Sequence, residues 1–530
     1  MKGRRSIKAL IGIITIATLM LFQSANALAQ SNGFTITPIV KRGDPSPDNG
    51  RFFICIDDCA ERITGSHAFN NRQDVSILSH TRGSCFYGIF LASLEKSELV
   101  ANPCQQTPLG VLNSISDVNI NDHGQAAILG DLPNRVGAAI LFYSEGQITK
   151  VVSIGDRTPT GETFRGCGFS PPSINNKGEI AFGACAENDQ GLFRDGVLLY
   201  SNGELRRLVT SGDPSPLGGI LSLNFAPAID GLINNNTEVL FQAGSITDLL
   251  VPEKFGLFLA TKDGVKKIVV DGDPMPGGNI VEPQSLGIGD LNDKGEVAFT
   301  VLLDGPADTG IFINSQGTIS KIMTQGDASP IGGTFSTLRD PELFERFLFI
   351  SPRINERSVV AFKAKVKDGG SRLGIFLASP KAILKVVAIG DMLPTGEEVR
   401  EINSFALNDL NQVAFFAGGK KGGKDPIGLY VATPAQPEIK SIKLKRKQGS
   451  LELRVNGKAM IANDTIIEIN GVALGELSYP AEFKQDGGTT TRVVSRDARL
   501  EQLIAPGQSV QVIIYNPLTN LRSTSRSFTR

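Results

Sequence analysis

Short apolar stretches separated by polar turns run along the chain, and the repeats show no helical period. Ser173–Phe182 shows the pattern most clearly, with Asn175 and Gly178 in a four-residue turn and an apolar run from Ile180 onward. Asn can hold a turn through its side chain, and Gly can adopt the positive φ that such a turn needs. An apolar run without alternation is typical of a strand buried on both faces. The pattern therefore predicts two strands joined by a tight turn.

The same turn recurs six more times along the chain. The motif Asn-x-x-Gly-x-x-Ala-Phe is intact at Asn175–Phe182 and at Asn292–Phe299, which includes Gly295. Looser copies begin at Asn71, Asn121, Asn234, Asn355 and Asn408. Each turn is followed by a short apolar strand, and in most units a further strand ends on Gly-Asp-x-x-Pro. Repeats of about four strands over more than 40 residues are typical of β-propeller blades.

The two ends of the repeat array complement each other. The seventh unit runs into Thr433–Pro437 without its last strand, while Ile36–Pro45 has that strand and the Gly-Asp-x-x-Pro ending before the first turn. Pro38 fits an edge strand, where its missing N–H is not needed. We therefore predict an all-β fold, a seven-bladed β-propeller closed by the N-terminal strand.

The repeat ends at a proline-containing linker, residues 434–438. Beyond it, residues 439–530 contain alternating strands, such as Leu451–Val455, separated by Asn-Gly and Asp-Gly turns. This pattern predicts a small immunoglobulin-like β-sandwich. The predicted organisation is a signal peptide at 1–29, the propeller at 30–433, the linker, and the sandwich.

Met1–Ala29 has the features of a secretory signal peptide: four basic residues, an apolar run, and small residues at the cleavage region. An uncleaved membrane anchor is the alternative, but the apolar run is short for a spanning helix. We expect a secreted or periplasmic protein with no stable membrane insertion after cleavage.

All six cysteines follow the signal, and an even number in an exported chain predicts disulfides. Cys167 and Cys185 lie eight residues before and ten after Asn175, so a hairpin at that turn brings them together across adjacent strands. Elimination leaves the pairs Cys55–Cys59 and Cys85–Cys104. The Cys55-x3-Cys59 spacing also resembles half of a metal site, but no second pair matches it. We predict structural disulfides and no metal.

The seven units resemble an exported bacterial tandem-repeat family named for Asn-x-x-Gly-x-x-Ala-Phe, over about Phe34–Thr433. The tail is similar to IPT/TIG immunoglobulin-like modules, through Leu453-x-Val455-x-Gly457 and Ile467-x-Ile469-Asn470-Gly471. Such modules act as spacers or binding domains. The biochemical role of the repeat family is undefined, so the resemblance implies no catalytic residue.

The Asp residues of Gly-Asp-x-x-Pro could form a ring of carboxylates that binds Ca²⁺ or a cationic ligand. A turn capped by the Asp side chain is the interpretation that we favour, because Asp before proline commonly does this. Two segments, Asp290–Gly295 and Asp117–Asn121, also resemble calcium loops, but neither has the Glu at the twelfth position of such loops, and we interpret them as hairpin turns. The six Asp residues of the Gly-Asp-x-x-Pro motif are Asp44, Asp156, Asp213, Asp273, Asp327 and Asp391. We expect no cofactor, with Ca²⁺ as the alternative.

Catalytic signatures are scarce. The three His residues (His67, His80, His123) lie in the first two units, no Gly-x-Ser-x-Gly motif is near them, and the chain has no Trp. The net charge is −1, which divides into +4 over the signal peptide, −10 over Gln30–Gln436 and +5 over the tail. The basic run Lys440–Lys447 could meet polyanions, but its alternation favours a solvated strand face, and we expect no nucleic-acid partner.

We therefore expect an exported, non-catalytic binding or scaffold protein whose rim loops contact an envelope or extracellular protein or polysaccharide. The alternative is a hydrolase or lyase with a carboxylate site in the propeller channel. Loops that differ between units are the expected contact surface, because positions shared by all units serve the common fold. The largest are Arg51–Ser66, Thr247–Lys254, Leu338–Phe349 and Gly418–Asp425.

Overall fold

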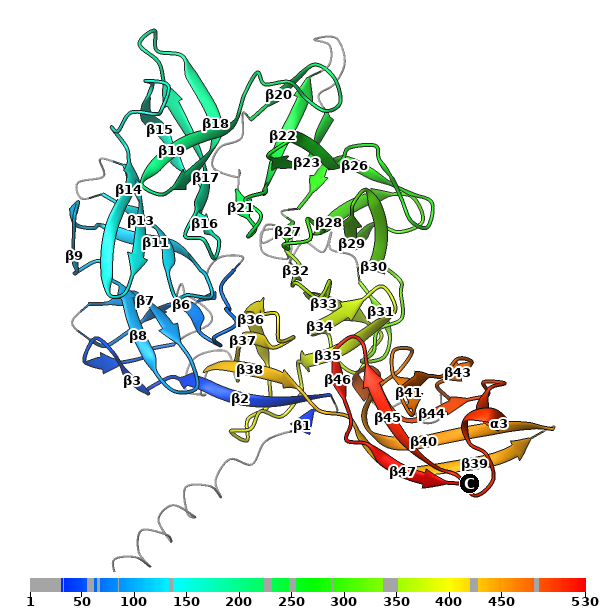
Figure 1. Ribbon diagram of the computed structural model, residues 1–530. Coiled ribbons are helices and arrows are strands. Elements are labelled where there is room, and N and C mark those ends of the chain that lie inside the picture. Colours follow the sequence, from blue (N-terminus) through cyan, green and yellow to red (C-terminus); the bar gives the residue numbers. More distant parts are fainter. Residues whose placement is uncertain are drawn as a thin grey trace, which may run out of the picture.

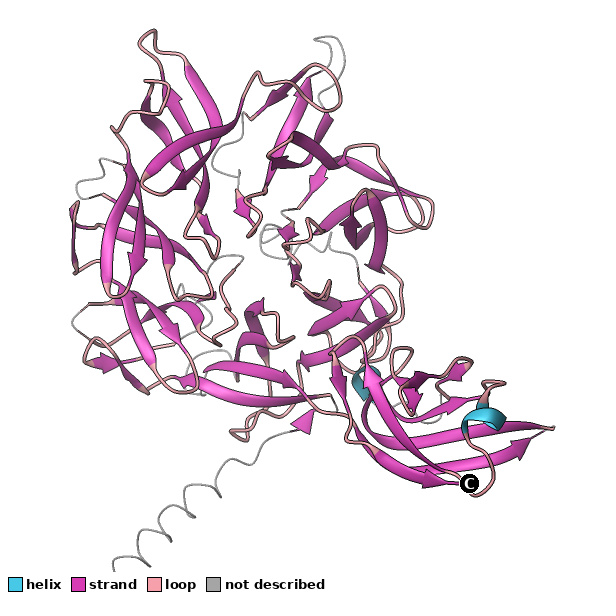
Figure 2. Ribbon diagram, viewed as in Figure 1, coloured by secondary structure: helices cyan, strands magenta, loops and turns pink. Residues whose placement is uncertain are grey.

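The computed structural model describes residues 30–31, 33–54, 62–63, 67–83, 85–132, 137–223, 231–246, 254–287, 289–336, 351–419, 428–447, 449–480 and 486–530. The described chain is almost entirely strand and turn (Figure 2), and its longest described helix is the four-residue α3 (Leu500–Leu503). The predicted signal peptide lies outside the described residues. None of the described helices has the length and apolar character to cross a membrane.

Seven antiparallel sheets of four to six strands follow one another along the described chain and stand around a common centre (Figure 1). The first sheet contains β5 (Arg62–Ile63), β6 (Val75–His80), β7 (Tyr87–Ala92) and β8 (Ser97–Ala101). The second contains β11 (Ser114–Ile120), β12 (Ala126–Asp131), β13 (Ala138–Ser144) and β14 (Gln147–Ser153). The third contains β15 (Thr163–Phe169), β16 (Ser173–Ile174), β17 (Ile180–Glu187), β18 (Phe193–Ser201) and β19 (Glu204–Thr210).

The fourth sheet contains β20 (Ile220–Ser222), β21 (Leu232–Ile233), β22 (Val239–Ile246), β23 (Lys254–Thr261) and β24 (Gly264–Val270). The fifth contains β25 (Pro274–Met275), β26 (Asn279–Leu286), β27 (Asp290–Leu291), β28 (Val297–Asp304), β29 (Thr309–Ser315) and β30 (Thr318–Thr324). The sixth contains β31 (Thr334–Phe335), β32 (Arg353–Ile354), β33 (Val360–Lys367), β34 (Leu373–Ser379) and β35 (Ala382–Ala388). The all-β class and the four-stranded antiparallel repeats predicted from the sequence are thus confirmed.

The seventh sheet joins the two ends of the array. It contains β36 (Glu401–Leu407), β37 (Val413–Gly418), β38 (Gly428–Pro434), β2 (Phe34–Lys41) and β1 (Gln30–Ser31), and β2 pairs antiparallel with β38. The register shifts between Pro38 and Val40, so the proline lies at a bulge, where a missing N–H is tolerated. Phe34 and Ile36 are buried in the core that this sheet shares with the sixth one. The N-terminal strand β2 therefore belongs to the same sheet as β36, β37 and β38.

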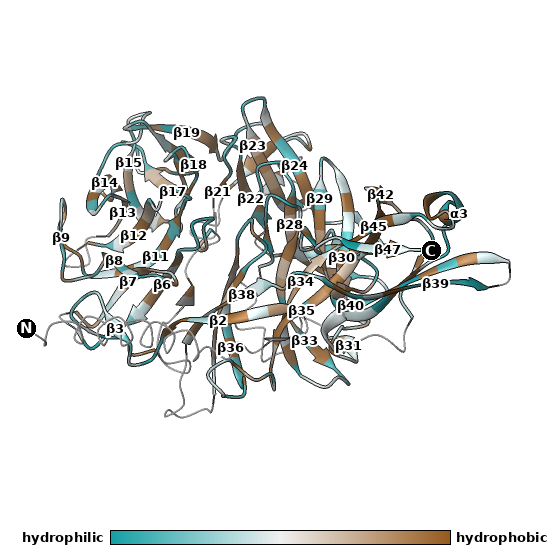
Figure 3. Cartoon of the chain, turned by 60° about the horizontal axis from the view of Figure 1, so that its bottom comes forward, coloured by the Kyte–Doolittle hydropathy of each residue, from teal (hydrophilic) through white to brown (hydrophobic). Residues whose placement is uncertain are grey.

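Neighbouring sheets pack face to face through the strand that follows each turn. In β17, Ile180 and Phe182 join the core shared with the second sheet, whereas Ala181 joins the core shared with the fourth. All three residues are fully buried. Figure 3 shows apolar residues along the strands of these sheets. The apolar run without alternation was therefore correctly interpreted as a strand buried on both faces.

The tail forms two further sheets around a separate core. Their strands are β39 (Glu438–Lys447), β40 (Ser450–Ile461), β44 (Thr489–Ser495) and β43 (Leu477–Ser478) in one sheet, and β42 (Val472–Ala473), β41 (Ile466–Ile469), β45 (Ser509–Asn516), β46 (Leu521–Arg522) and β47 (Arg526–Thr529) in the other. The tail contacts the sixth and seventh sheets: Gly487 N–H donates to the Pro330 carbonyl, and the Asn411 amide donates to the Thr519 carbonyl.

A disulfide joins Cys85 and Cys104, with their Cα atoms 5.9 Å apart. Cys185 in β17 is also disulfide-bonded. The side chain of Cys167, its predicted partner in β15, lies outside the described residues, as do Cys55 and Cys59. The pairings Cys167–Cys185 and Cys55–Cys59 therefore stay predictions.

Candidate functional site

The repeated turns meet at the centre of the ring, where each is held by its Asn side chain. Asn175 Oδ1 accepts hydrogen bonds from the N–H groups of Lys177 and Glu179, each at 3.0 Å. Gly178 has φ +76°, as the motif predicts. The equivalent residues of four other units also have positive φ although they are not Gly: Gln73, Thr237, Ser358 and Asn411. The turn is therefore kept even where the Gly of the motif is lost.

The seven turn asparagines form a closed circuit of hydrogen bonds. In each unit the side-chain amide donates to the backbone carbonyl of the turn Asn in the next unit, at 2.9–3.4 Å, and the last bond returns from Asn408 to Asn70. The members are Asn70, Asn121, Asn175, Asn234, Asn292, Asn355 and Asn408. The circuit corrects one prediction: in the first unit the turn begins at Asn70, not at Asn71, because Asn70 Oδ1 accepts the Asp74 N–H.

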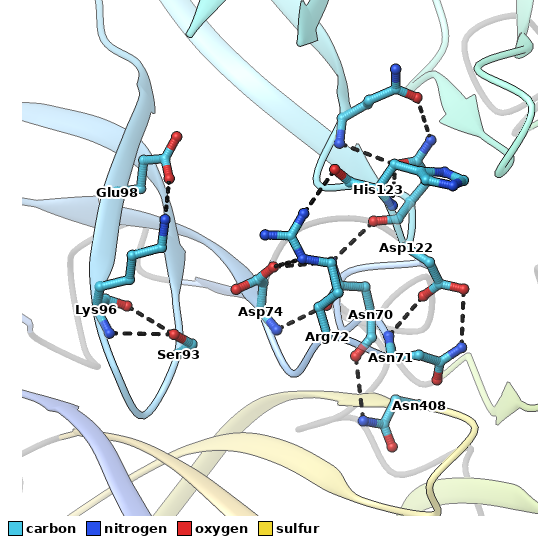
Figure 4. A network of polar contacts seen from close by, with 12 residues as sticks. Asn70, Asn71, Arg72, Asp74, Ser93, Lys96, Glu98, Asp122, His123 and Asn408 are labelled. Carbon is cyan, nitrogen blue, oxygen red and sulfur yellow. Dashed lines mark hydrogen bonds and ion pairs between the residues drawn. The ribbon is translucent and has the colours of Figure 1, made fainter. Parts of the chain in front are cut away.

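The residue after each turn Asn forms a second closed circuit. Each side-chain oxygen accepts the backbone N–H of the equivalent residue in the preceding unit, at 2.6–3.0 Å. Figure 4 shows Asn71 and Asp122 paired in this way, with the Asn70 carbonyl facing Asn408. The members of this polar ring are Asn71, Asp122, Asn176, Asn235, Asp293, Glu356 and Asp409. Four of the seven are acidic, so the ring gathers negative charge on the axis.

Among the residues of the polar ring, Glu356 has the pKa that is raised most clearly. Burial, together with the neighbouring carboxylates of Asp293 and Asp409, raises its pKa to about 7. Its Oε1 accepts the Asp293 N–H at 2.7 Å. The group is therefore half-protonated near neutral pH, and the charge of the polar ring changes in the physiological range.

A small cavity of about 100 Å³ lies inside these two circuits. Its wall includes the apolar residue that precedes each turn Asn, together with His67. The apolar residues are Phe69, Ile120, Ile174, Ile233, Leu291, Ile354 and Leu407. Pockets for small organic ligands usually measure 300–1,000 Å³. The cavity therefore has room for a few waters and not for a sugar ring.

One polar contact at the centre is specific to a few units. His67 Nε2 lies 3.7 Å from Oδ1 of Asp290, so a residue just before the first turn approaches the fifth sheet. Asp290 is fully buried, which raises its pKa, and its Oδ2 accepts the Ile354 N–H at 2.9 Å. Its Oδ1 and the Nε of Arg353 have no hydrogen-bond partner among the described residues. Burying polar groups without hydrogen-bond partners costs free energy. The turn geometry that all units share does not require these two buried groups.

The aspartates of Gly-Asp-x-x-Pro lie in capped turns, as the favoured interpretation predicts. Asp156 Oδ2 accepts the Ser153 N–H at 2.8 Å, and the other five Asp make the equivalent bond three residues back. In four units the Lys six residues before the Asp also contacts the carboxylate: Lys150, Lys267, Lys321 and Lys385. These carboxylates are thus engaged within their own units and do not converge on one ligand.

The side chains of the two segments that resemble calcium loops diverge. Asp290–Gly295 runs from β27 into a hairpin turn, as predicted, whereas Asp117–Ile120 lies within β11, so the interpretation of that segment as a hairpin turn was wrong. Asp290 faces His67, whereas Asp293 belongs to the polar ring and binds Asn235. In the other segment, Asn119 Oδ1 accepts the His67 N–H at 2.8 Å. Across the described residues, no group of three or more His, Cys, Asp or Glu side chains could hold a metal ion.

Sequence reasoning missed both the polar ring and the His67–Asp290 contact. The signal for the ring was present, since every turn Asn is followed by Asn, Asp or Glu. Nothing in the sequence indicates that His67 approaches Asp290, because the two residues are more than 220 positions apart. Most of the four unit-specific loops, including 55–61, 247–253, 337–350 and 420–427, lies outside the described residues. The alternation predicted for the basic run is present in part, with Lys443 and Lys445 exposed and Leu444 partly buried.

Comparison with known proteins places the chain in a family without assigning an activity. The model of a family described as "Family of unknown function (DUF7453)" matches residues 15–346 and 308–439. None of the curated proteins matches the chain.

Among solved structures, the chain is similar to the β-propeller domain of the Trilobed protease from Pyrococcus furiosus, with 9% identity, a TM-score of 0.41, and coverage of 71% of this chain and 96% of that one. It is also similar to the polysaccharide lyase Uly1, with 10% identity, a TM-score of 0.36, and coverage of 74% and 97%. A third similar structure is Trypanosoma rangeli sialidase, with 11% identity, a TM-score of 0.29, and coverage of 75% of this chain and 59% of that one. At these scores we draw no functional conclusion from the likeness.

Proposed function

This chain belongs to the family of unknown function DUF7453, and we propose that it is an exported, non-catalytic binding or scaffold protein. In this proposal the seven sheets are the blades of a closed propeller, and the tail is an immunoglobulin-like module related to IPT/TIG domains. Unit-specific loops on the rim contact an envelope or extracellular partner. The repeats would then be of the Asn-x-x-Gly-x-x-Ala-Phe kind that the sequence resembles.

The observation that carries this proposal is the engagement of the central polar groups in contacts between units. Each turn Asn and each polar-ring residue bonds the backbone of a neighbouring unit. In two units the residue that follows the polar-ring residue in the sequence adds a further hydrogen bond between units. Arg72 donates to the His123 carbonyl, and Arg357 donates to the Asp409 carbonyl. Groups used in this way hold the units together, and the cavity that the described residues line is too small for a sugar substrate. The centre thus supports a scaffold better than an active site.

Closure is supported by two independent sets of contacts. The first is the antiparallel pairing of β2 with β38, which supports closure by the N-terminal strand. Both hydrogen-bond circuits pass from the seventh unit back to the first, through Asn408 to Asn70 and Asp409 to Asn71. A ring without an open edge gives rim loops a rigid support, which lowers the entropy cost of binding.

One observation favours the alternative, a hydrolase or lyase with a central site. The buried Asp290 lies opposite His67, which lines the cavity, and a carboxylate that orients a His is a common arrangement in general-base catalysis. The pair would need an opening larger than the described cavity to reach a polymer.

The test is to replace the loops at 247–253, 337–350 and 420–427 singly with short Gly-Ser linkers in the exported chain. Binding to an envelope or extracellular component should be lost in at least one variant, while the melting temperature stays within about 2 °C of the wild type. Turnover of polysaccharide or ester substrates by the purified protein, abolished by Asp290→Asn, would support the alternative and overturn the proposal.

A further inference from the structure

A groove lies between the edge strand β24 of the fourth sheet and the strands β29 and β30 of the fifth (Figure 3), away from the central cavity. Its volume is about 430 Å³, within the 300–1,000 Å³ of pockets that hold small ligands. All of its lining residues are described, and none belongs to the unit-specific loops. We call it the outer groove, and its wall includes Lys267, Ile268, Pro274, Pro276, Asn314 and Ile319.

Asn314 leaves this space open. The residue is buried, and its Nδ2 donates to the Ile268 carbonyl at 2.7 Å. The pairing of the last two strands shows that the equivalent residue is Tyr143 in the second unit and Tyr200 in the third. Tyr143 joins the core between the first and second sheets, and its hydroxyl donates to Glu98 of the first unit at 2.6 Å. A tyrosine ring thus fills the space between sheets that the shorter Asn leaves free.

The equivalent groove between the fifth and sixth sheets holds a turn of the tail. The turn is η4 (Asp486–Gly488), the short helix where the tail meets the ring of sheets in Figure 2. The Gly487 N–H donates to the Pro330 carbonyl at 3.0 Å. A Cβ atom at Gly488 would lie 2.4 Å from the Ile383 carbonyl oxygen, so the backbone of the turn rests directly on β35. The tail therefore shows what such a groove binds.

Both contact points of the tail turn have equivalents in the outer groove. Pro330 ends the Gly-Asp-x-x-Pro-type turn of the fifth unit, as Pro276 ends that of the fourth. Ile383 and Ile319 occupy the same position in the register of the last two strands. The Pro276 carbonyl accepts the Asn279 side-chain amide at 3.0 Å, and a carbonyl oxygen has a second lone pair for another N–H. The outer groove thus offers the same acceptor and the same strand surface.

The tail turn shields the strand that it contacts. A Cβ atom at Gly487 would lie 3.2 Å from Cβ and Cε of Lys385, whose side chain is 7% exposed. The equivalent residue of the fifth unit, Lys321, is 42% exposed, although each Lys pairs with the Asp six residues further on. The strand β30 beside the outer groove therefore keeps the exposed surface that β35 loses to the tail.

Two consecutive glycines let the tail turn approach so closely. Gly487 and Gly488 have φ values of +84° and +85°, in the left-handed region that favours glycine. Any Cβ at the second position would also overlap the carbonyl oxygen of the strand beneath. A segment that binds the outer groove in the same way must therefore present two adjacent glycines in a turn.

We propose that the outer groove binds a Gly-Gly turn of a partner protein, as its equivalent binds the tail turn. The N–H of the first glycine donates to the Pro276 carbonyl, and the second glycine rests on the backbone of Ile319. A second copy of this chain is not the occupant, because its tail turn is already bound on its own sheets. The inference goes beyond the proposed function, since the groove lies outside the unit-specific loops.

The probe is a cyclic peptide with the sequence of residues 484–490, which includes the Asp-Gly-Gly turn. It is titrated by calorimetry into the full chain without its predicted signal peptide, in which the tail turn already fills the equivalent groove. We expect one peptide to bind per chain, with a Kd of about 0.1 mM. The same peptide with Ala in place of both glycines should not bind.

Two variants fill the outer groove with residues that other units carry at the same positions. Asn314→Tyr introduces the residue type of the second and third units, and Pro274→Arg introduces that of Arg157 in the second unit. Each should weaken peptide binding about tenfold or more. The matched control is Pro214→Arg, the same change at the equivalent exposed position between the third and fourth units. The control should bind as the wild type does.

The outcomes separate this inference from the proposed function. Failure of the peptide to bind, equal binding of the Ala peptide, wild-type affinity in Pro274→Arg, or an equal loss in Pro214→Arg would each overturn it. Dimers that Pro274→Arg disrupts in sedimentation experiments would identify a second copy as the occupant and would also overturn it. The loop replacements described above test the proposed function independently. Melting temperatures should stay within about 2 °C of the wild type, and if Asn314→Tyr fails to fold, Pro274→Arg at an exposed residue still decides the result.

Discussion

At the scale of single residues, the central positions combine a fold-forming role with an electrostatic cost. Each polar-ring side chain accepts a backbone N–H from the preceding unit, and an amide serves this purpose as well as a carboxylate does, as Asn71, Asn176 and Asn235 show. Where acids replace amides in consecutive units, at Asp293, Glu356 and Asp409, their mutual repulsion raises the free energy of the fully ionised state.

Replacing Glu356 with Gln should make the protein more stable at alkaline pH. Because its pKa is raised from about 4.5 to about 7 in the folded protein, the wild type loses stability as the pH rises from 4.5 through 7. Gln keeps the acceptor for the Asp293 N–H and carries no charge. We expect thermal unfolding of Glu356→Gln to match the wild type at pH 5 and to show a gain of about 1 kcal/mol at pH 8, after allowance for partial exposure.

The matched control is Glu204→Gln, at an exposed Glu of the third unit. It should leave the difference in melting temperature between pH 5 and pH 8 as in the wild type. A Glu356→Gln variant that is less stable than the wild type at pH 8 would contradict the assigned repulsion.

At the scale of elements, the strand after each turn determines how neighbouring sheets pack. Phe299 in β28 lies opposite Phe312 in β29, with ring centroids 6.0 Å apart, and both rings are fully buried. The pairs Phe241–Phe258, Phe362–Phe376 and Phe415–Tyr430 repeat this arrangement in other sheets. Ala298, the residue before Phe299, joins the core shared with the next sheet, so one strand contributes to two cores.

Phe299→Ala should destabilise the protein by about 3–5 kcal/mol, because it removes a buried ring and leaves a cavity between two sheets. Urea unfolding followed by circular dichroism would measure the loss. Phe193→Ala, at a ring that is 55% exposed, is the control and should change stability by less than about 0.5 kcal/mol. Equal effects of the two substitutions would show that the described packing is wrong.

At the scale of the whole molecule, the proposed closure makes the N-terminal strand essential to all units. Phe34, Ile36 and Val40 are almost fully buried, and the first two join the core between the sixth and seventh sheets. Loss of β2 would expose the edge of β38 and the apolar faces beside it.

Deleting Phe34–Arg42 should lower the stability of the whole ring by roughly 6 kcal/mol, from three buried apolar side chains at about 2 kcal/mol each. Differential scanning calorimetry should show a lower melting temperature for the propeller transition. The conservative variant Thr37→Ser in the same strand should melt as the wild type does. An unchanged melting temperature after the deletion would rule out closure by this strand.

The sequence by itself determined the local structure of the repeats. Apolar runs, turn residues and their regular recurrence specify strands and tight turns, because each depends on neighbours a few positions away. The division of one repeat unit between the two ends of the chain was also visible in the sequence. The seventh unit lacks its last strand, and the N-terminal segment has a strand of that same pattern. The position of the turn in the first unit was wrong by one residue. Asn70 and Asn71 are adjacent in the sequence, and their contacts with Asp74 and Asn121 show that Asn70 is the turn residue.

Only the tertiary structure decided what lies at the centre and on the rim. The polar ring arises because seven turns, each unremarkable in sequence, converge on one axis, where their charges interact. The His67–Asp290 contact and the stacking of Arg42 and Arg82 on Phe53 join residues whose proximity depends on how whole sheets are placed. Such contacts follow from the arrangement of units in space, which local periodicity does not encode.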